Sequence, residues 1–86
     1  MFYVYILKSL KDNKFYIGYT SDLRNRFKEH QNGEVVSTKP RRPFELIFYE
    51  AYQSMKDAKR REKYFKTGKG KSTIRMMLQD TLKINE

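Results

Sequence analysis

Two short runs of β-branched, aromatic and aliphatic residues, separated by a polar turn, constrain the fold of this chain more than any other feature. The runs cover residues 2–8 and 15–19, and residues 11–14 read Lys-Asp-Asn-Lys between them. Val, Ile, Tyr and Phe favour strands, whereas Asp and Asn tolerate the backbone angles that a turn needs. The pattern therefore predicts an antiparallel β-hairpin, with alternate side chains on opposite faces.

Helical periods, caps and breakers predict the rest of the order. Two prolines in residues 39–43 favour an extended loop there. The other expected elements are a helix capped by Ser21 or Asp22 that ends before Gly33, a strand over residues 44–50, a helix over residues 54–66 and, after a break at Gly68 and Gly70, a last helix capped by Ser72. The order β-β-α-β-α-α predicts an α/β (α+β) domain whose three-stranded, mostly antiparallel sheet is flanked by helices.

Length and composition limit the class of protein. The 86 residues make one small domain, residues 1–86, since there is no room for a second core. Aromatic residues form 15% of the chain, so it does not read as disordered. The absence of cysteine excludes disulfides and thiolate zinc sites. No stretch approaches a membrane span and the N-terminus lacks the basic region of a signal peptide, so we expect a cytoplasmic protein without a membrane partner.

One acidic side chain, Glu62, occupies an unexpected place in the predicted helix over residues 54–66. At about 3.6 residues per turn, it shares the only apolar stripe of this helix with Met55, Ala58 and Phe65. A carboxylate there faces the core or a cleft, and its burial is costly without a cation, a hydrogen-bond network or a metal ion. The alternative is an exposed Glu at the margin of the stripe, or one paired with a basic residue.

The net charge of the chain is +9, and the excess is uneven. Residues 39–71 hold eleven Lys or Arg residues and four acidic ones. Such a concentration favours a polyanionic partner, of which nucleic acid is the commonest; the alternatives are an inert basic surface and, more weakly, an acidic membrane surface. The basic residues expected to bind nucleic acid are Lys39, Arg41, Arg42, Lys59, Arg60, Lys69 and Lys71.

Polar side chains suited to phosphate chemistry are predicted to gather on one face, namely those of Tyr5, Tyr16, Arg26, His30 and Glu62. Arg26 and His30 lie four residues apart on the first helix, so both flank its apolar stripe. Tyr16 and Gly18 share a face of the second strand, and Tyr5 joins them if the hairpin register permits. Cutting a phosphodiester needs a proton acceptor, which Tyr or His can supply, and a grip on phosphoryl oxygens, which Arg can supply. A lone carboxylate can hold one Mg²⁺ or Mn²⁺ ion.

The same residues carry a resemblance to a known family. Their order and spacing resemble the GIY-YIG nuclease superfamily, and most closely its small stand-alone bacterial proteins of the YhbQ-like type, over roughly residues 2–80. The second motif tripeptide is intact, whereas the first reads Tyr-Val-Tyr in place of Gly-Ile-Tyr and keeps the last tyrosine. The segments that carry the resemblance are Val4-Tyr5-Ile6, Tyr16-Ile17-Gly18, Asp22-Leu23 with Arg26-Phe27 and His30, and Ala58 with Arg61-Glu62-Lys63.

The resemblance implies the superfamily's fold, a three-stranded antiparallel sheet packed with helices, and metal-dependent hydrolysis of nucleic acid. The nuclease module of the excision-repair subunit UvrC is an example. It thus implies an endonuclease acting on DNA in repair or recombination, with RNA as a further candidate substrate and a single Mg²⁺ or Mn²⁺ ion as cofactor. By position, Tyr5 and Tyr16 become the motif tyrosines, and either is a candidate general base. Arg26 becomes the phosphate-binding arginine, His30 a proton-transfer residue and Glu62 the single metal ligand.

One departure from the superfamily pattern keeps two other functions open. Many active members carry an Asn after the metal-binding helix, and residues 67–77 of this chain contain none. Gln79 and Asn85 lie beyond that region. The first alternative is a nucleic-acid-binding module with weak or no catalysis. The second is a protein-interaction adaptor whose basic helix docks an acidic partner.

Overall fold

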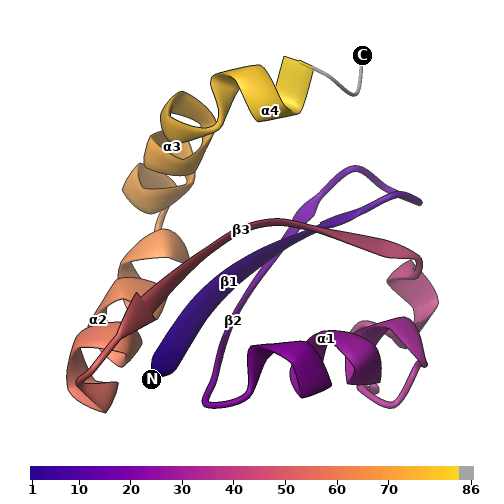
Figure 1. Cartoon of the computed structure of the whole chain (residues 1–86). Helices are drawn as coiled ribbons and strands as arrows, with labels where there is room; N and C mark the ends of the chain where they lie inside the picture. Colours follow the sequence, from indigo (N-terminus) through magenta and orange to yellow (C-terminus); the bar gives the residue numbers. More distant parts are fainter. Residues whose placement is uncertain (84–86) are drawn as a thin grey trace.

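The computed structural model describes residues 1–83, so Asn85 and the end of the expected domain lie outside the described part of the chain. Among the described residues, no helix is long and apolar enough to cross a membrane. Figure 1 shows the elements in chain order. They are β1 (Phe2–Ser9), β2 (Phe15–Thr20), α1 (Leu23–Gln31), the single 3-10 turn η1 (Lys39–Arg41), β3 (Phe44–Tyr52), α2 (Met55–Phe65), α3 (Gly68–Met77) and α4 (Gln79–Lys83).

The predicted hairpin and the three-stranded antiparallel sheet are confirmed. The strand order is β2-β1-β3, so β2 and β3 are the two edges. In the β1–β2 register Tyr5 lies opposite Gly18, and Leu7 lies opposite Tyr16. Because opposite residues share a face, both motif tyrosines lie on the same side of the sheet. A bulge in β3, between the partners of Ile6 and Leu7, increases the local bend of that strand.

The two faces of the sheet are covered by different helices (Figure 1). On one face Val4 and Ile6 pack with Phe65 of α2 and Ile74 of α3, and these four side chains are fully buried. On the other face α1 covers a smaller second core. Its buried members are Tyr5, Leu7 and Phe44, and its partly buried members are Tyr16, Leu23, Phe27 and Leu46.

The start of α1 follows the sequence prediction closely. Asp22 is the N-cap, and its side chain accepts a hydrogen bond from the Asn25 backbone at 3.1 Å. Gly33, just past the helix end, has a φ of 77°, the left-handed conformation predicted for that position. A correct cap at this helix matters because α1 carries two candidate site residues.

The last helix begins earlier than predicted, and the expected break at Gly68 and Gly70 is wrong. Thr67, not Ser72, is the N-cap: its hydroxyl accepts from the Gly70 backbone at 3.0 Å. Gly70 lies inside α3. A Cβ at this position would meet the Tyr64 carbonyl oxygen at 1.9 Å, so a larger residue would clash with α2. This glycine therefore permits the close approach of α2 and α3. The helical segment also divides at its far end, where α4 follows as a separate short helix.

The prediction of a purely extended loop over residues 39–43 is also wrong in part. Lys39–Arg41 form one 3-10 turn, with Pro40 in its first turn. Proline is tolerated there because the first N–H groups of a helix have no partner within the helix. The turn brings the loop back against β1, where the Ser9 hydroxyl donates to the Arg41 carbonyl at 2.7 Å.

Candidate active site

The centre of the candidate site is a buried hydrogen-bonded chain of three side chains. The Tyr5 hydroxyl lies 2.9 Å from His30 Nε2, and His30 Nδ1 lies 2.8 Å from the Thr38 hydroxyl. All three side chains are at most 1% exposed. β1, α1 and the loop before η1 each contribute one member, so residues far apart in sequence meet at one point. The direct hydrogen bond between Tyr5 and His30 was not predicted from the sequence.

Gly18 allows the Tyr5 ring to lie across the neighbouring strand β2. A Cβ at position 18 would stand 2.3 Å from both Cζ and the hydroxyl oxygen of Tyr5. Real Cβ contacts do not approach so closely, so any larger residue would push the phenol away from His30. The Tyr5 ring thus occupies the space that a side chain at Gly18, the glycine of the second motif tripeptide, would take.

Tyr16 and Arg26 complete the side of the site that faces α1. The Tyr16 ring meets the His30 ring edge-to-face, with centroids 5.0 Å apart, and lies 6.3 Å from the Tyr5 ring. Arg26 is half-buried and forms an ion pair with Glu29 at 3.0 Å. Its guanidinium also interacts with the Tyr5 hydroxyl, an interaction that favours the phenolate. Four of the five predicted site residues therefore lie together.

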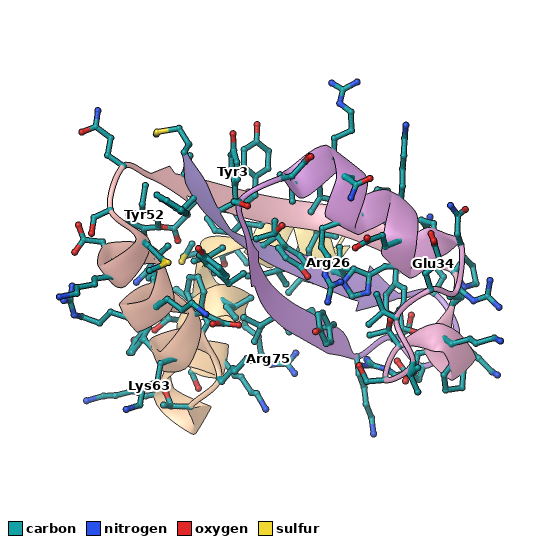
Figure 2. All side chains as sticks on the ribbon, turned by 90° about the horizontal axis from the view of Figure 1, so that it is seen from below. Tyr3, Arg26, Glu34, Tyr52, Lys63 and Arg75 are labelled. Atoms are coloured by element: carbon teal, nitrogen blue, oxygen red, sulfur yellow. The ribbon has the colours of Figure 1, made fainter. Side chains whose placement is uncertain are left out.

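Glu62 belongs to a helix on the opposite face of the sheet, so the prediction that it shares one face with the other four residues is wrong. Its helix, α2, contacts the face opposite to Tyr5, and Figure 2 shows β2 running between α1 and α2. The Glu62 side chain is 19% exposed and pairs with Lys66 at 3.1 Å. Its negative charge contributes to the raised pKa of Tyr5, so the two groups lie within electrostatic range. The carboxylate is thus mostly shielded, and its partner is a basic residue, as one of the alternatives from the sequence predicted.

The rest of the predicted apolar stripe is correct only in part. Ala58 and Phe65 are fully buried in the first core, whereas Met55, in the first turn of α2, is 49% exposed. The neighbouring Arg61 points away from the site: it pairs with Glu50 at 3.0 Å and lies over the Phe65 ring at 4.2 Å. Arg61 therefore secures α2 against β3, while Glu62 remains available at the β2 edge.

Burial sets the protonation states of the central pair. It raises the pKa of Tyr5 to about 12, and this rise is only partly offset by Arg26. Burial also lowers the pKa of His30 to about 4, and the nearby Arg26 charge lowers it further. At neutral pH the pair is therefore a phenol beside a neutral imidazole.

The hydrogen bonds around His30 select one tautomer. The Thr38 hydroxyl has a single hydrogen, and it is within hydrogen-bonding distance of the Val35 carbonyl at 3.4 Å. If Thr38 donates to that carbonyl, it accepts from Nδ1–H, and Nε2 is left to accept from Tyr5. This is the only arrangement that makes all three hydrogen bonds. It points the free electron pair of the imidazole at the Tyr5 hydroxyl.

The donor set fits a hard divalent cation that keeps most of its waters. Within residues 1–83, no three His, Asp or Glu side chains cluster as metal ligands. Zn²⁺ would need more protein ligands, whereas Mg²⁺ is often held by one or two carboxylates and several waters. Glu62 can supply that one carboxylate, because its surface pair with Lys66 is weak and easily exchanged.

The basic residues predicted to bind nucleic acid differ in whether their side chains have partners within the fold. Four of them have such a partner. Arg41 and Arg42 have partners within the fold: Arg41 pairs with Asp12 at 2.9 Å, and Arg42 donates to the Lys39 carbonyl at 3.0 Å. Arg60 forms an exposed pair with Asp57, and Lys59 lies over the Tyr19 ring at 4.3 Å. The remaining predicted residues, Lys39, Lys69 and Lys71, are exposed.

Two residues near the site were not singled out from the sequence. Thr38 has no local signal, because its role depends on the path of the loop that returns to α1. Arg75 lies on α3, over the Phe15 ring at 5.2 Å. Figure 2 shows Arg26 and Arg75 on either side of β2.

Comparison with known proteins shows the family of the chain. The GIY-YIG catalytic domain matches residues 1–75. The UPF0213 protein YazA of Bacillus subtilis is 46% identical over 65 residues, which cover 74% of this chain and 65% of that protein. A UPF0213 protein of Pediococcus pentosaceus is 36% identical over 84 residues, covering 96% of this chain and 87% of that protein.

A solved structure shares the fold. The solution NMR structure of the UPF0213 protein BH0048 from Bacillus halodurans is 36% identical, with a TM-score of 0.56, and the match covers 90% of this chain and 85% of that one. All strands and the five candidate site residues lie inside the range matched by the catalytic domain. The chain therefore belongs to the GIY-YIG family, among its small bacterial UPF0213 proteins.

Proposed function

We propose that this chain is an endonuclease that hydrolyses DNA phosphodiester bonds with one Mg²⁺ or Mn²⁺ ion, in DNA repair or recombination. GIY-YIG domains are in general nuclease domains that use divalent metal ions. The observation that carries the proposal is the Tyr5–His30 hydrogen bond of 2.9 Å, beside Arg26 and within range of the Glu62 carboxylate. Such a set has the parts that phosphodiester hydrolysis requires.

The Tyr5–His30 pair supplies a route for the proton of the attacking water. In the tautomer that satisfies Thr38, His30 Nε2 accepts from the Tyr5 hydroxyl. As the Tyr5 oxygen takes a proton from water, its own proton can pass to Nε2. The imidazolium that forms is costly in this buried place, but the negative charge of the reacting phosphate offsets part of that cost. RNA remains a further candidate substrate for the same chemistry.

Arg26 and a cation held at Glu62 would stabilise the negative charge on the reacting phosphate. Arg26 is half-buried, and a guanidinium can bind two phosphoryl oxygens at once. A divalent ion held at Glu62 would neutralise charge on the phosphate and on the leaving oxygen. Arg26 lies beside β2 in Figure 2, and the helix that carries Glu62 contacts the same strand, which agrees with a substrate backbone passing along β2.

A cleavage assay with matched acidic variants tests the proposal. Purified protein is incubated with branched, single-stranded and duplex DNA in Mg²⁺ or Mn²⁺, together with Glu62→Gln and Glu45→Gln variants. Glu45 is an exposed carboxylate on β3 with no ion pair among the described residues, so its loss removes the same charge elsewhere. We expect cutting by the wild type and Glu45→Gln, and a loss of at least 100-fold for Glu62→Gln. Cutting that survives Glu62→Gln would mean a different mechanism or a contaminant.

The second candidate is a nucleic-acid-binding module with weak or no catalysis. The pKa of Tyr5, raised to about 12, favours it, because a phenol is a poor base until a cation lowers that value. The absence of Asn from residues 67–77 also favours it. Salt-dependent DNA binding with no cutting in either metal would support this candidate and exclude the first.

A further inference from the structure

A groove on the far side of α1 from His30 opens the second core to solvent. It has a volume of about 680 Å³ and lies between the start of α1 and the neighbouring parts of β1 and β3. Its floor is apolar, because Leu23, Phe27 and Leu46 line it and pack against the buried core. Tyr3 and Tyr49 line it from the sheet.

The cations of the groove and the polar residues of the catalytic cluster lie on opposite sides of the same helix. Arg26 and His30 belong to the cluster, while Arg24 and Lys28 line the groove. The two pairs are offset by two residues, which is about 200° around an α-helix. In Figure 2, Tyr3 lies apart from Arg26, near the start of α1. A ligand held by Arg24 and Lys28 would therefore not cover the Arg26 side of the helix.

The sheet side of the groove presents aromatic rings. Tyr3 and Tyr49 meet edge-to-face, with centroids 6.2 Å apart and planes inclined by 64°. Tyr49 is 53% exposed, although it is a large ring beside an apolar floor. Exposed aromatic rings of this kind are the surfaces on which unpaired nucleobases stack.

The helix side of the groove presents positive charge. Arg24 and Lys28 lie one turn apart, both are exposed, and neither forms an ion pair with another residue of the described chain. The only acid in the lining is Asp22, whose side chain is occupied as the N-cap of α1. The groove therefore combines stacking surfaces with two cations that have no ion-pair partner among the described residues.

We infer that this groove binds a single-stranded nucleic-acid segment, with a base against Tyr49 and Tyr3 and phosphates on Arg24 and Lys28. The inference rests on the proposed function in one respect, namely that the partner is a nucleic acid. It adds a substrate class: DNA with an unpaired segment beside the bond that is cut.

Other occupants match the groove less well. Duplex DNA hides its base faces within the stack, so it could use the two cations but not the rings. An acidic peptide would also need the cations, yet it gains little from exposed phenol faces. The charge and the rings together select a strand whose bases are free to stack.

Fluorescence anisotropy with labelled DNA in EDTA tests the inference without cutting. The probes are a 12-nucleotide single strand and a duplex of equal length, and the variants are Tyr49→Ala and Tyr49→Phe. We expect Tyr49→Ala to weaken single-strand binding about tenfold and duplex binding less than twofold. Tyr49→Phe keeps the stacking surface and should bind as the wild type does. Equal single-strand affinity for Tyr49→Ala and the wild type would overturn the inference.

A second arm tests the cations. The double variant Arg24→Gln/Lys28→Gln should lower the slope of log Kd against log salt for the single strand by about 1.4, or about 0.7 for each lost phosphate contact. Lys14→Gln/Lys83→Gln removes the same charge from exposed positions outside the groove and should leave the slope nearly unchanged. Equal slopes for the two double variants would overturn the inference.

The binding experiments test the groove separately from the nuclease activity proposed above. Binding in EDTA does not depend on cleavage, and loss of cleavage in Glu62→Gln does not depend on the groove. If the protein cuts DNA but Tyr49→Ala changes nothing, only the groove assignment falls. If Tyr49 selects single strands but no metal supports cutting, only the nuclease proposal falls.

Discussion

The two faces of the sheet bury different kinds of side chain. The face under α2 and α3 is closed and apolar, with Val4, Ile6 and Phe65 fully buried. The face under α1 buries polar groups instead, and His30, Thr38 and Ser9 are fully enclosed there. Burying polar groups is costly unless they bond to one another. In the described part of the chain, every buried side-chain nitrogen and oxygen has a partner.

This difference explains how a chain of only 86 residues can accommodate the candidate active site. A small domain has little stability to spare, so one face must supply most of the hydrophobic stabilisation. The other face can then carry a phenol, an imidazole and a hydroxyl whose hydrogen bonds specify position more than stability. Variants on the two faces should accordingly separate stability from activity.

The largest effect should come from the apolar face. Phe65→Ala removes a fully buried ring, and we expect the free energy of unfolding to fall by about 4 kcal/mol. Urea denaturation measures this loss, with the exposed Met55→Ala on the same helix as a control that should cost less than about 1 kcal/mol. A loss below about 1 kcal/mol for Phe65→Ala would remove the distinction between the faces.

Removing one hydroxyl from the polar face should mainly affect catalysis. Tyr5→Phe keeps the ring but breaks the 2.9 Å bond to His30. We expect cleavage to fall about 100-fold, which is roughly 2.7 kcal/mol of barrier, while unfolding changes by only about 1 kcal/mol. Single-turnover cleavage and urea denaturation of the same preparation give both numbers. Tyr19→Phe removes a hydroxyl on the other face of the sheet and should cut normally, and an equally active Tyr5→Phe would exclude the proton route.

The buried histidine should make stability depend on pH. The pKa of His30 is about 4 in the folded chain, against an ordinary 6.5, so the unfolded chain binds an extra proton between these values. Stability is then fully present above pH 6.5 and falls as the pH is lowered towards 4, by at most about 1.4 kcal/mol per pH unit. Urea midpoints between pH 7.5 and 4.5 should show this slope in the wild type and a smaller one in His30→Gln. Equal slopes would mean that His30 titrates normally.

The smallest effect should come from a single methyl group between the two motifs. Gly18→Ala places a Cβ against the Tyr5 ring, so we expect cleavage to fall about tenfold. Because the variant acts by moving the Tyr5 hydroxyl, it should cost little further activity in a Tyr5→Phe background. A double-mutant cycle measures this, and simple additivity of the two losses would contradict the packing explanation.

Local rules were enough to predict much of the fold. Alternation predicted the hairpin and allowed a common face for Tyr5 and Tyr16, and short-range capping chemistry limited the start of α1 to Ser21 or Asp22, of which Asp22 is the N-cap. These features depend on residues a few positions apart, where propensity and turn chemistry decide. The grouping of Arg26 with His30 followed in the same way, from helical spacing alone.

The rest of the fold depends on contacts between distant segments. Nothing near Gly70 shows that it packs on the Tyr64 carbonyl, and its neighbour Gly68 made a break look reasonable. Thr38 matters only because the loop returns to α1. Glu62 was predicted from its stripe, but its approach past the edge strand depends on how α2 packs on the opposite face. Tertiary packing, not propensity, decides each of these cases.

The central claim is that side chains from both faces meet at the β2 edge around one carboxylate that can hold a cation. Paramagnetic broadening by Mn²⁺, read residue by residue by NMR, tests it most directly. We predict that substoichiometric Mn²⁺ broadens the signals of Glu62, Tyr16 and Arg26 first, and that Glu62→Gln abolishes this pattern while Glu45→Gln preserves it. Broadening centred elsewhere, or unchanged in Glu62→Gln, would contradict the claim.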